Sequence, residues 1–144
     1  MKRASVILLI LIALWLTACQ SITTTQPTVE VAGNNVSVDG GSYTDVNTAE
    51  LQTMLANKDF IFINVHIPFE GNIPNTDLSI AYDQVDQNLD KLPSDKNAKI
   101  VLYCRSGRMS EIAAKTLVGL GYTNLWNLSG GMAAWEQAGL KIDR

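Results

Sequence analysis

The sequence has few of the residues that hold metals or cross-link small domains. Two cysteines and one histidine in 144 residues exclude a disulfide framework and a cysteine-rich zinc site. Positive charge is also scarce, because 11 Lys and Arg stand against 14 Asp and Glu. This balance excludes nucleic-acid binding by phosphate neutralisation. The 47% of hydrophobic residues is typical of one modest globular domain.

Some of this hydrophobic content lies outside any domain, in a run at the start of the chain. Lys2 and Arg3 precede an uninterrupted apolar run from Val6 to Leu16. The run is shorter than the roughly 20 residues that a membrane-spanning helix needs. Residues 1–18 are therefore predicted to be an export signal, and a buried N-terminal helix or strand is the alternative.

The residues that follow this run resemble the lipobox of bacterial lipoproteins. The segment is Leu16-Thr17-Ala18-Cys19, and the bulky Leu16 stands where ordinary signal cleavage needs a small residue. The resemblance implies that Cys19 is acylated, for example with palmitate, and that it anchors the protein in a membrane. Gln20 then favours the periplasmic face of the outer membrane, and a Gram-positive surface lipoprotein is the alternative.

Between the acylated cysteine and the domain, residues 19–42 are predicted to form a tether with a short hairpin. Residues 20–28 carry no charge and offer little to bury, which is typical of a flexible linker. Alternating residues at 29–31 and 36–38 flank Ala-Gly-Asn-Asn and predict a small β-hairpin. The globular domain is expected over residues 43–144.

Within that domain, strand patterns alternate with helix patterns. Apolar runs at 60–65 and 100–103 predict buried strands, and a further strand is expected at 124–128. Asn47–Glu50 resembles a capping box and predicts a helix that ends near Asn57, with Leu51, Met54 and Leu55 on one face. Helices are also expected over 83–92, after Cys104 and after Gly131. The inward stripe expected for the helix after Cys104 is Met109, Ile112, Ala113, Thr116, Leu117 and Leu120. This alternation predicts an α/β fold with a central parallel β-sheet flanked by helices.

The most informative motif places a cysteine between a buried strand and a helix. Cys104 follows the strand at 100–103, and Arg105 and Arg108 lie in the loop that leads into the helix. Ligands bind at this edge of an open α/β sheet. The helix N-terminus and the two arginines favour an anion, so we expect Cys104 to be a reactive thiolate beside an oxyanion site. The alternative is an inert, buried cysteine.

At these positions the sequence resembles the rhodanese family over most of residues 43–140. The matching segments are Tyr103–Gly107 with Ser110, Gly71–Pro74, and Leu128–Gly131 followed by Trp135. The resemblance implies a sulfurtransferase in which Cys104 takes the outer sulfur of thiosulfate and carries it as a persulfide to a thiol or cyanide acceptor. It implies a monomer that needs no metal or cofactor for this chemistry. The loop residues implied to bind the substrate are Arg105, Ser106, Gly107, Arg108 and Met109.

The sequence departs from the family pattern at two places. Met109 stands where many single-domain members have arginine, so Arg108, one residue earlier, is expected to point in a different direction from the family's arginine. Asn64-Val65-His66 replaces Asp-Val-Arg. His66 is interpreted as a histidine at the pocket rim, and a Cys104–His66 pair is the sharper alternative.

Two other functions compete with sulfur transfer. One is a module that carries a persulfide or binds a partner without turning over thiosulfate. The other is a phosphatase or arsenate reductase, which would need an arginine six residues after the cysteine. That position is Ser110, so this second alternative is disfavoured.

Overall fold

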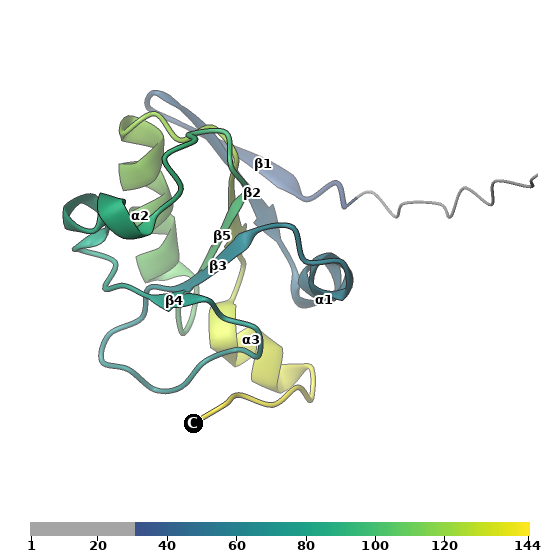
Figure 1. The fold of residues 1–144 in the computed structure, drawn as a ribbon. Helices are drawn as coiled ribbons and strands as arrows, with labels where there is room; N and C mark the ends of the chain where they lie inside the picture. Colours follow the sequence, from purple (N-terminus) through teal and green to yellow (C-terminus); the bar gives the residue numbers. More distant parts are fainter. Residues whose placement is uncertain (1–30) are drawn as a thin grey trace, which may run out of the picture.

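A six-stranded, mostly parallel β-sheet forms the centre of the computed structural model, which describes residues 31–144 (Figure 1). The strand order is β1-β2-β6-β5-β3-β4; only β1 and β2 pair in antiparallel fashion. This confirms the predicted α/β class. The strands are β1 (Asn34–Val38), β2 (Gly41–Val46), β3 (Ile61–Asn64), β4 (Leu78–Ser79), β5 (Ile100–Tyr103) and β6 (Leu125–Leu128).

Helices cover both faces of the sheet. In Figure 1, α2 (Arg108–Gly119) lies on one face, and α1 (Thr48–Ala56) and α3 (Gly131–Gln137) lie on the other. β5 shows why both faces must be covered: Ile100 and Leu102 join the core beneath α2, whereas Val101 and Tyr103 join the core beneath α1 and α3. A central strand buried on both faces explains the uninterrupted apolar run in the sequence.

The capping box predicted at the start of the first helix is confirmed. The Asn47 side chain accepts a hydrogen bond from the Glu50 amide, and the Glu50 carboxylate accepts one from the Asn47 amide. Leu51 and Met54 are buried as expected, and Asn57 is the C-cap.

The hairpin near the N-terminus has a different register from the one predicted. β1 pairs with β2 through a turn at Asp39-Gly40, with Val36 opposite Tyr43. The expected partner at 29–31 forms no strand at residue 31, and its other two residues lie outside the described part. The physical reason is the Asp-Gly turn, in which Gly40 adopts a φ of 88°, together with β6, which extends the pairing of β2 into the main sheet.

The buried face of α2 is rotated relative to the predicted stripe. Ala113 and Leu117 are buried as expected, but Ile112 is 42% exposed and Leu120 is 39% exposed. Ala114 and Val118 are buried in their place, and Met109 and Thr116 are half-buried. The small alanines let the helix approach the sheet closely, and this packing outweighs the periodicity of the larger side chains.

The segment 83–92, predicted to be helical, forms two single turns of 3₁₀ helix at Val85–Gln87 and Leu89–Lys91. Asn88 separates them, and its side-chain amide donates to the Gln84 carbonyl at 2.8 Å. Such local side-chain bonding competes with a continuous helix.

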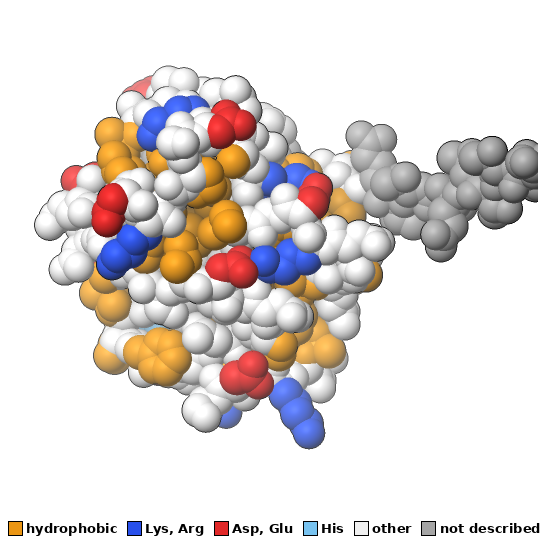
Figure 2. All heavy atoms as spheres, in the orientation of Figure 1, with side chains coloured by type: hydrophobic (Ala, Val, Ile, Leu, Met, Phe, Trp, Pro, Cys, Tyr) orange, Lys and Arg blue, Asp and Glu red, His pale blue; other side chains and the backbone are white. Residues whose placement is uncertain are grey.

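Acidic and basic side chains are interspersed with hydrophobic surface on the face drawn in Figure 2. No helix within residues 31–144 has both the length and the apolar character needed to cross a membrane. The predicted export signal, Cys19 and most of the predicted tether lie outside the described residues.

Candidate functional site

The candidate nucleophile Cys104 follows β5 directly and is only 1% exposed. Its Sγ accepts a hydrogen bond from the Gly107 amide at 3.1 Å, and the Ser110 hydroxyl lies 3.6 Å away. Ser110 Oγ also donates to the Gly107 carbonyl at 2.8 Å. The loop therefore curls around the sulfur, and the amide N–H stabilises negative charge on it.

The Cys104 loop, residues 104–107, ends at a glycine that the helix start requires. Gly107 is the N-cap of α2 with a φ of 101°, a conformation that residues with a Cβ rarely adopt. The first amides of α2 have no partner within the helix, and the helix dipole is positive at this end. The loop therefore presents N–H donors and positive potential beside the sulfur, as expected for an oxyanion site.

The start of α3 holds the Cys104 loop from the other side. The Met132 amide donates to the Cys104 carbonyl and the Ala133 amide to the Arg105 carbonyl, each at 2.9 Å. Gly131 makes this approach possible, because a Cβ there would lie 2.2 Å from the Cys104 carbonyl oxygen. The Gly130-Gly131 motif is therefore part of the architecture of the site.

The loop residues expected to bind substrate have different surroundings. Arg105, Ser106 and Arg108 are exposed, and Gly107 is buried. Met109 is half-buried and packs against the core beneath α2. Within residues 31–144, Arg108 has no carboxylate at ion-pair distance, whereas Arg105 is paired with Glu70. Arg105 in the loop and Arg108 at the start of α2 are thus both exposed, but of the two only Arg105 has a carboxylate partner within residues 31–144.

Glu70 was not identified as a site residue from the sequence. Its carboxylate forms an ion pair and a hydrogen bond with the Arg105 guanidinium, and it lies 3.6 Å from His66 Nε2. The hydrogen bond from Arg105 is the main cause that lowers the pKa of Glu70 below its ordinary value, and the nearby charges of Arg105 and His66 add to this. No sequence signal pointed to this pair, because the partners are 35 residues apart and meet only through the fold.

His66 lies at the carboxyl end of β3 with its side chain 8% exposed. Neither ring nitrogen has a hydrogen-bond partner, so no hydrogen bond joins His66 to Cys104 Sγ, and its part in catalysis stays a prediction. The neighbouring Asn64 organises the backbone: it accepts from the His66 amide at 2.9 Å and donates to the Gly71 carbonyl and to Asn72.

A buried tyrosine connects β5 to the Gly71–Pro74 motif. The Tyr103 hydroxyl accepts from the Ile73 amide at 3.0 Å, lies 2.7 Å from Thr76 Oγ1 and donates to Asn72 Oδ1 at 3.2 Å. Burial raises the pKa of Tyr103 above its ordinary value, so the hydroxyl keeps its proton and can donate. This contact fixes the segment after β3 against the strand that carries Cys104.

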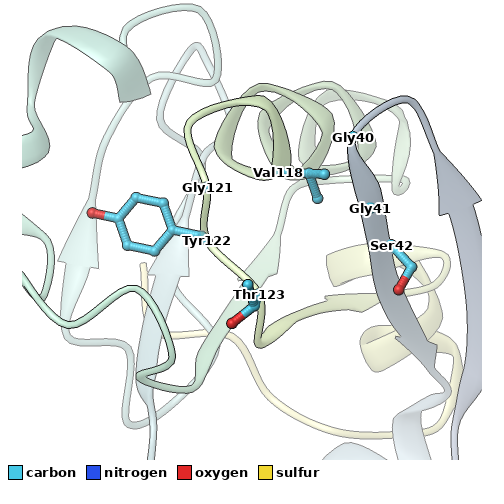
Figure 3. Close-up of a pocket in the computed structure, with 7 residues that line it drawn as sticks. All are labelled: Gly40, Gly41, Ser42, Val118, Gly121, Tyr122 and Thr123. Carbon is cyan, nitrogen blue, oxygen red and sulfur yellow. The ribbon is translucent and has the colours of Figure 1, made fainter.

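A shallow pocket of about 260 Å³ lies away from this site (Figure 3). It is lined by the β1–β2 turn at Gly40 and Gly41, by Val118, and by residues 121–123 just before β6. These segments precede parallel strands, so the pocket lies at the opposite edge of the sheet from Cys104. Cys104 is therefore held in a loop and not at the base of this pocket.

Comparisons with known proteins agree with this geometry. The model of the rhodanese-like domain matches residues 45–138. A sulfurtransferase from Allochromatium vinosum is 31% identical over 102 residues, covering 68% of this chain and 92% of that protein.

Two further similarities show how widely this domain is used. A rhodanese-like domain protein from Staphylococcus aureus, of known structure, is 31% identical with a TM-score of 0.58, covering 69% of this chain and 98% of that one. A tRNA uridine(34) hydroxylase from Erwinia tasmaniensis is 29% identical, but the match covers 69% of this chain and only 29% of that protein. With a family model matching most of its length, this chain belongs to the rhodanese-like domain family.

Proposed function

We propose that this protein is a sulfurtransferase that moves a sulfane sulfur from thiosulfate, or a similar donor, to a thiophilic acceptor through a persulfide on Cys104. The observation that carries the proposal is the hydrogen bond from the Gly107 amide to Cys104 Sγ. It places the sulfur beside a backbone N–H donor at the N-terminus of α2. Similarity to a sulfurtransferase of nearly the same extent supports the general activity.

The proposed reaction balances without a cofactor. The Cys104 thiolate attacks the outer sulfur of thiosulfate, an S–S bond forms to Cys104, and the S–S bond of thiosulfate breaks. Sulfite leaves with the electron pair, so the negative charge is conserved. In the second step cyanide or a thiolate attacks the terminal sulfur of the persulfide, and the Cys104 thiolate is the leaving group.

The residues around Cys104 have distinct roles in this scheme. The Gly107 amide stabilises charge on the cysteine sulfur when it attacks and when it leaves. Arg105 and Arg108, exposed at the mouth of the loop, attract the donor anion and the departing sulfite. Gly107 and Gly131 keep the loop in the conformation in which the Gly107 amide points at the sulfur.

Mass spectrometry after incubation with thiosulfate tests the persulfide directly. We expect one added sulfur atom on the peptide that contains Cys104, and thiocyanate formation when cyanide is supplied. Cys104→Ser should lose both. Cys19→Ser is the matched control, because it removes the other cysteine of the chain and should retain both.

The outcomes separate the competing functions. Full turnover in Cys104→Ser would contradict the proposed nucleophile. A persulfide that forms without thiocyanate production would instead favour a carrier or partner-binding module. The tRNA hydroxylase relatives match over a small part of their length, so their printed activity is a weaker basis for this chain.

We also propose that the domain is exported and held at a membrane through acylated Cys19, at the periplasmic face of the outer membrane. The support is the lipobox-like segment Leu16–Cys19 behind an apolar run. Stable anchoring needs more than one acyl chain. The resemblance to bacterial lipoproteins implies that Cys19 carries more than one.

A further inference from the structure

The anion-binding arginine of the Cys104 loop already has an anionic partner from within the chain. The Glu70 carboxylate pairs with the Arg105 guanidinium, although the Arg105 side chain is 62% exposed and that of Glu70 39% exposed. Arg108, the other arginine at the mouth, has no such partner within residues 31–144. The arginine next to Cys104 in the chain is therefore already neutralised by a carboxylate of the protein itself.

The segment that carries Glu70 is placed at the site by the fold. Residues 66–70 follow β3, whose last residue pairs with Tyr103, the residue before Cys104. Asn64 fixes both ends of this segment by accepting from the His66 amide and donating to the Gly71 carbonyl. Two large hydrophobic side chains of this segment are exposed, Ile67 by 38% and Phe69 by 61%. Glu70 is thus held at the mouth of the Cys104 loop.

Glu70 also lies close to a buried histidine. His66 Nε2 lies 3.6 Å from the same Glu70 oxygen that bonds Arg105, and neither nitrogen of the buried imidazole has a hydrogen-bond partner. Loss of the Arg105 contact therefore leaves the His66 imidazole as the neighbour of the Glu70 carboxylate.

We propose that Glu70 is a specificity-determining residue, an internal carboxylate that competes with the sulfur donor for Arg105 and so selects donors by their charge. The proposal rests on the sulfur transfer proposed above. An anion must displace Glu70 from Arg105 or bind beside it, and repulsion from the carboxylate grows with the charge of the donor. Monoanionic donors, such as thiosulfonates and persulfides, are then disfavoured less than the thiosulfate dianion.

Steady-state kinetics with two donors test the selection. Glu70→Gln removes the charge and keeps the size of the side chain. We expect the KM for thiosulfate to fall about two- to five-fold, the range that an exposed ion pair supports, with kcat unchanged. The KM for methanethiosulfonate, a monoanion, should fall by a smaller factor.

A matched control exists in the same chain. Asp59 pairs with Lys99 in another exposed ion pair, just before β3 and β5 and so at the opposite end of these strands from Cys104. Asp59→Asn should leave both KM values unchanged. An unchanged thiosulfate KM in Glu70→Gln, or equal changes for the two donors, would overturn the selection by charge.

Equilibrium binding separates this proposal from the proposed reaction. Calorimetry with thiosulfate on the Cys104→Ser protein measures anion affinity without sulfur transfer, and adding Glu70→Gln should tighten binding by the same factor. Equal affinities would refute the role of Glu70 even if the enzyme turns over. Absence of binding in both proteins would refute it as well, because Arg105 would then hold no anion for Glu70 to oppose. If Glu70→Gln tightens thiosulfate binding but the wild-type protein does not turn over, the role of Glu70 is supported and the proposed sulfur transfer is refuted.

Discussion

Gly131 determines the position of the Cys104 carbonyl through the absence of a side chain. The Cys104 and Arg105 carbonyls both accept hydrogen bonds from the start of α3, and the space between the two segments has no room for a methyl group. The conformation of the nucleophile's loop thus depends on a residue far from it in sequence.

Gly131→Ala should displace the Cys104 loop and reduce sulfur loading strongly. The new Cβ would lie 2.2 Å from the Cys104 carbonyl oxygen, at a residue with a φ of 55°. Strain of the left-handed conformation costs about 1–2 kcal/mol and overpacking about 1–3 kcal/mol more. Urea unfolding measures the loss in the free energy of unfolding, and mass spectrometry measures the loading.

Gly139→Ala is the control for the strain of a positive φ without the steric overlap. Gly139 has a φ of 81°, and a Cβ there would meet nothing within 4 Å. It should lose only about 1–2 kcal/mol of stability and keep sulfur loading. If the two variants load sulfur equally, the close approach at Gly131 has no functional consequence.

At the scale of elements, β5 and the segment after β3 are joined by one hydroxyl. Tyr103 belongs to β5, and its hydroxyl accepts from the amide of Ile73, a fully buried residue. The same segment also pairs with the end of the chain, where Asn72 and Asp143 exchange backbone hydrogen bonds at 2.8 Å. This explains why a Gly-x-Ile-Pro segment accompanies the cysteine motif.

Tyr103→Phe should destabilise the protein by about 1–3 kcal/mol, because the buried Ile73 amide loses its acceptor. Tyr122→Phe is the matched comparison: it removes one hydrogen bond to the Pro93 carbonyl and should cost about 0.5–1.5 kcal/mol. Chemical denaturation of both variants gives the two values. A cost for Tyr103→Phe no larger than that for Tyr122→Phe would mean that the segment is held by other contacts.

The elements that the sequence predicted best are those whose signals are local. The apolar run of β5 and the Asn47–Glu50 capping box both depend only on residues close together in the sequence, and both predictions are confirmed. The prediction of the buried face of α2 was partly wrong. Packing against the sheet, and not hydrophobicity alone, determined that Ala114 is buried and Ile112 exposed. The register of β1 was missed because its partner is chosen by the Asp39-Gly40 turn.

In the site, too, residues with local sequence signals were predictable, and residues brought in by the fold were not. Cys104 and its loop form one continuous motif, so the sequence could place them at the end of a strand and the start of a helix. Glu70 and Gly131 reach the loop from elsewhere in the chain, and their contacts follow from the order of strands and helices. That order was not predictable from local periodicity.

At the scale of the whole molecule, the proposed anchor and the proposed site are independent parts. Cys19→Ser should abolish incorporation of a labelled fatty acid when the full chain is expressed in bacteria, and should release the protein from the membrane fraction. Sulfur loading of Cys104 should be unaffected, since the sheet, α2 and α3 all lie within residues 31–144. Retained label in Cys19→Ser would contradict the lipobox interpretation.

The contact between α3 and the Cys104 loop also imposes an order in time. Proteins are made from the N-terminus, so β5 and Cys104 emerge from the ribosome before residues 131–133. Until those residues follow, the Cys104 and Arg105 carbonyls lack the amides of Met132 and Ala133 that hold them in the folded protein. A nascent chain that pauses between the two segments therefore has its Cys104 loop without the two backbone hydrogen bonds that the start of α3 supplies.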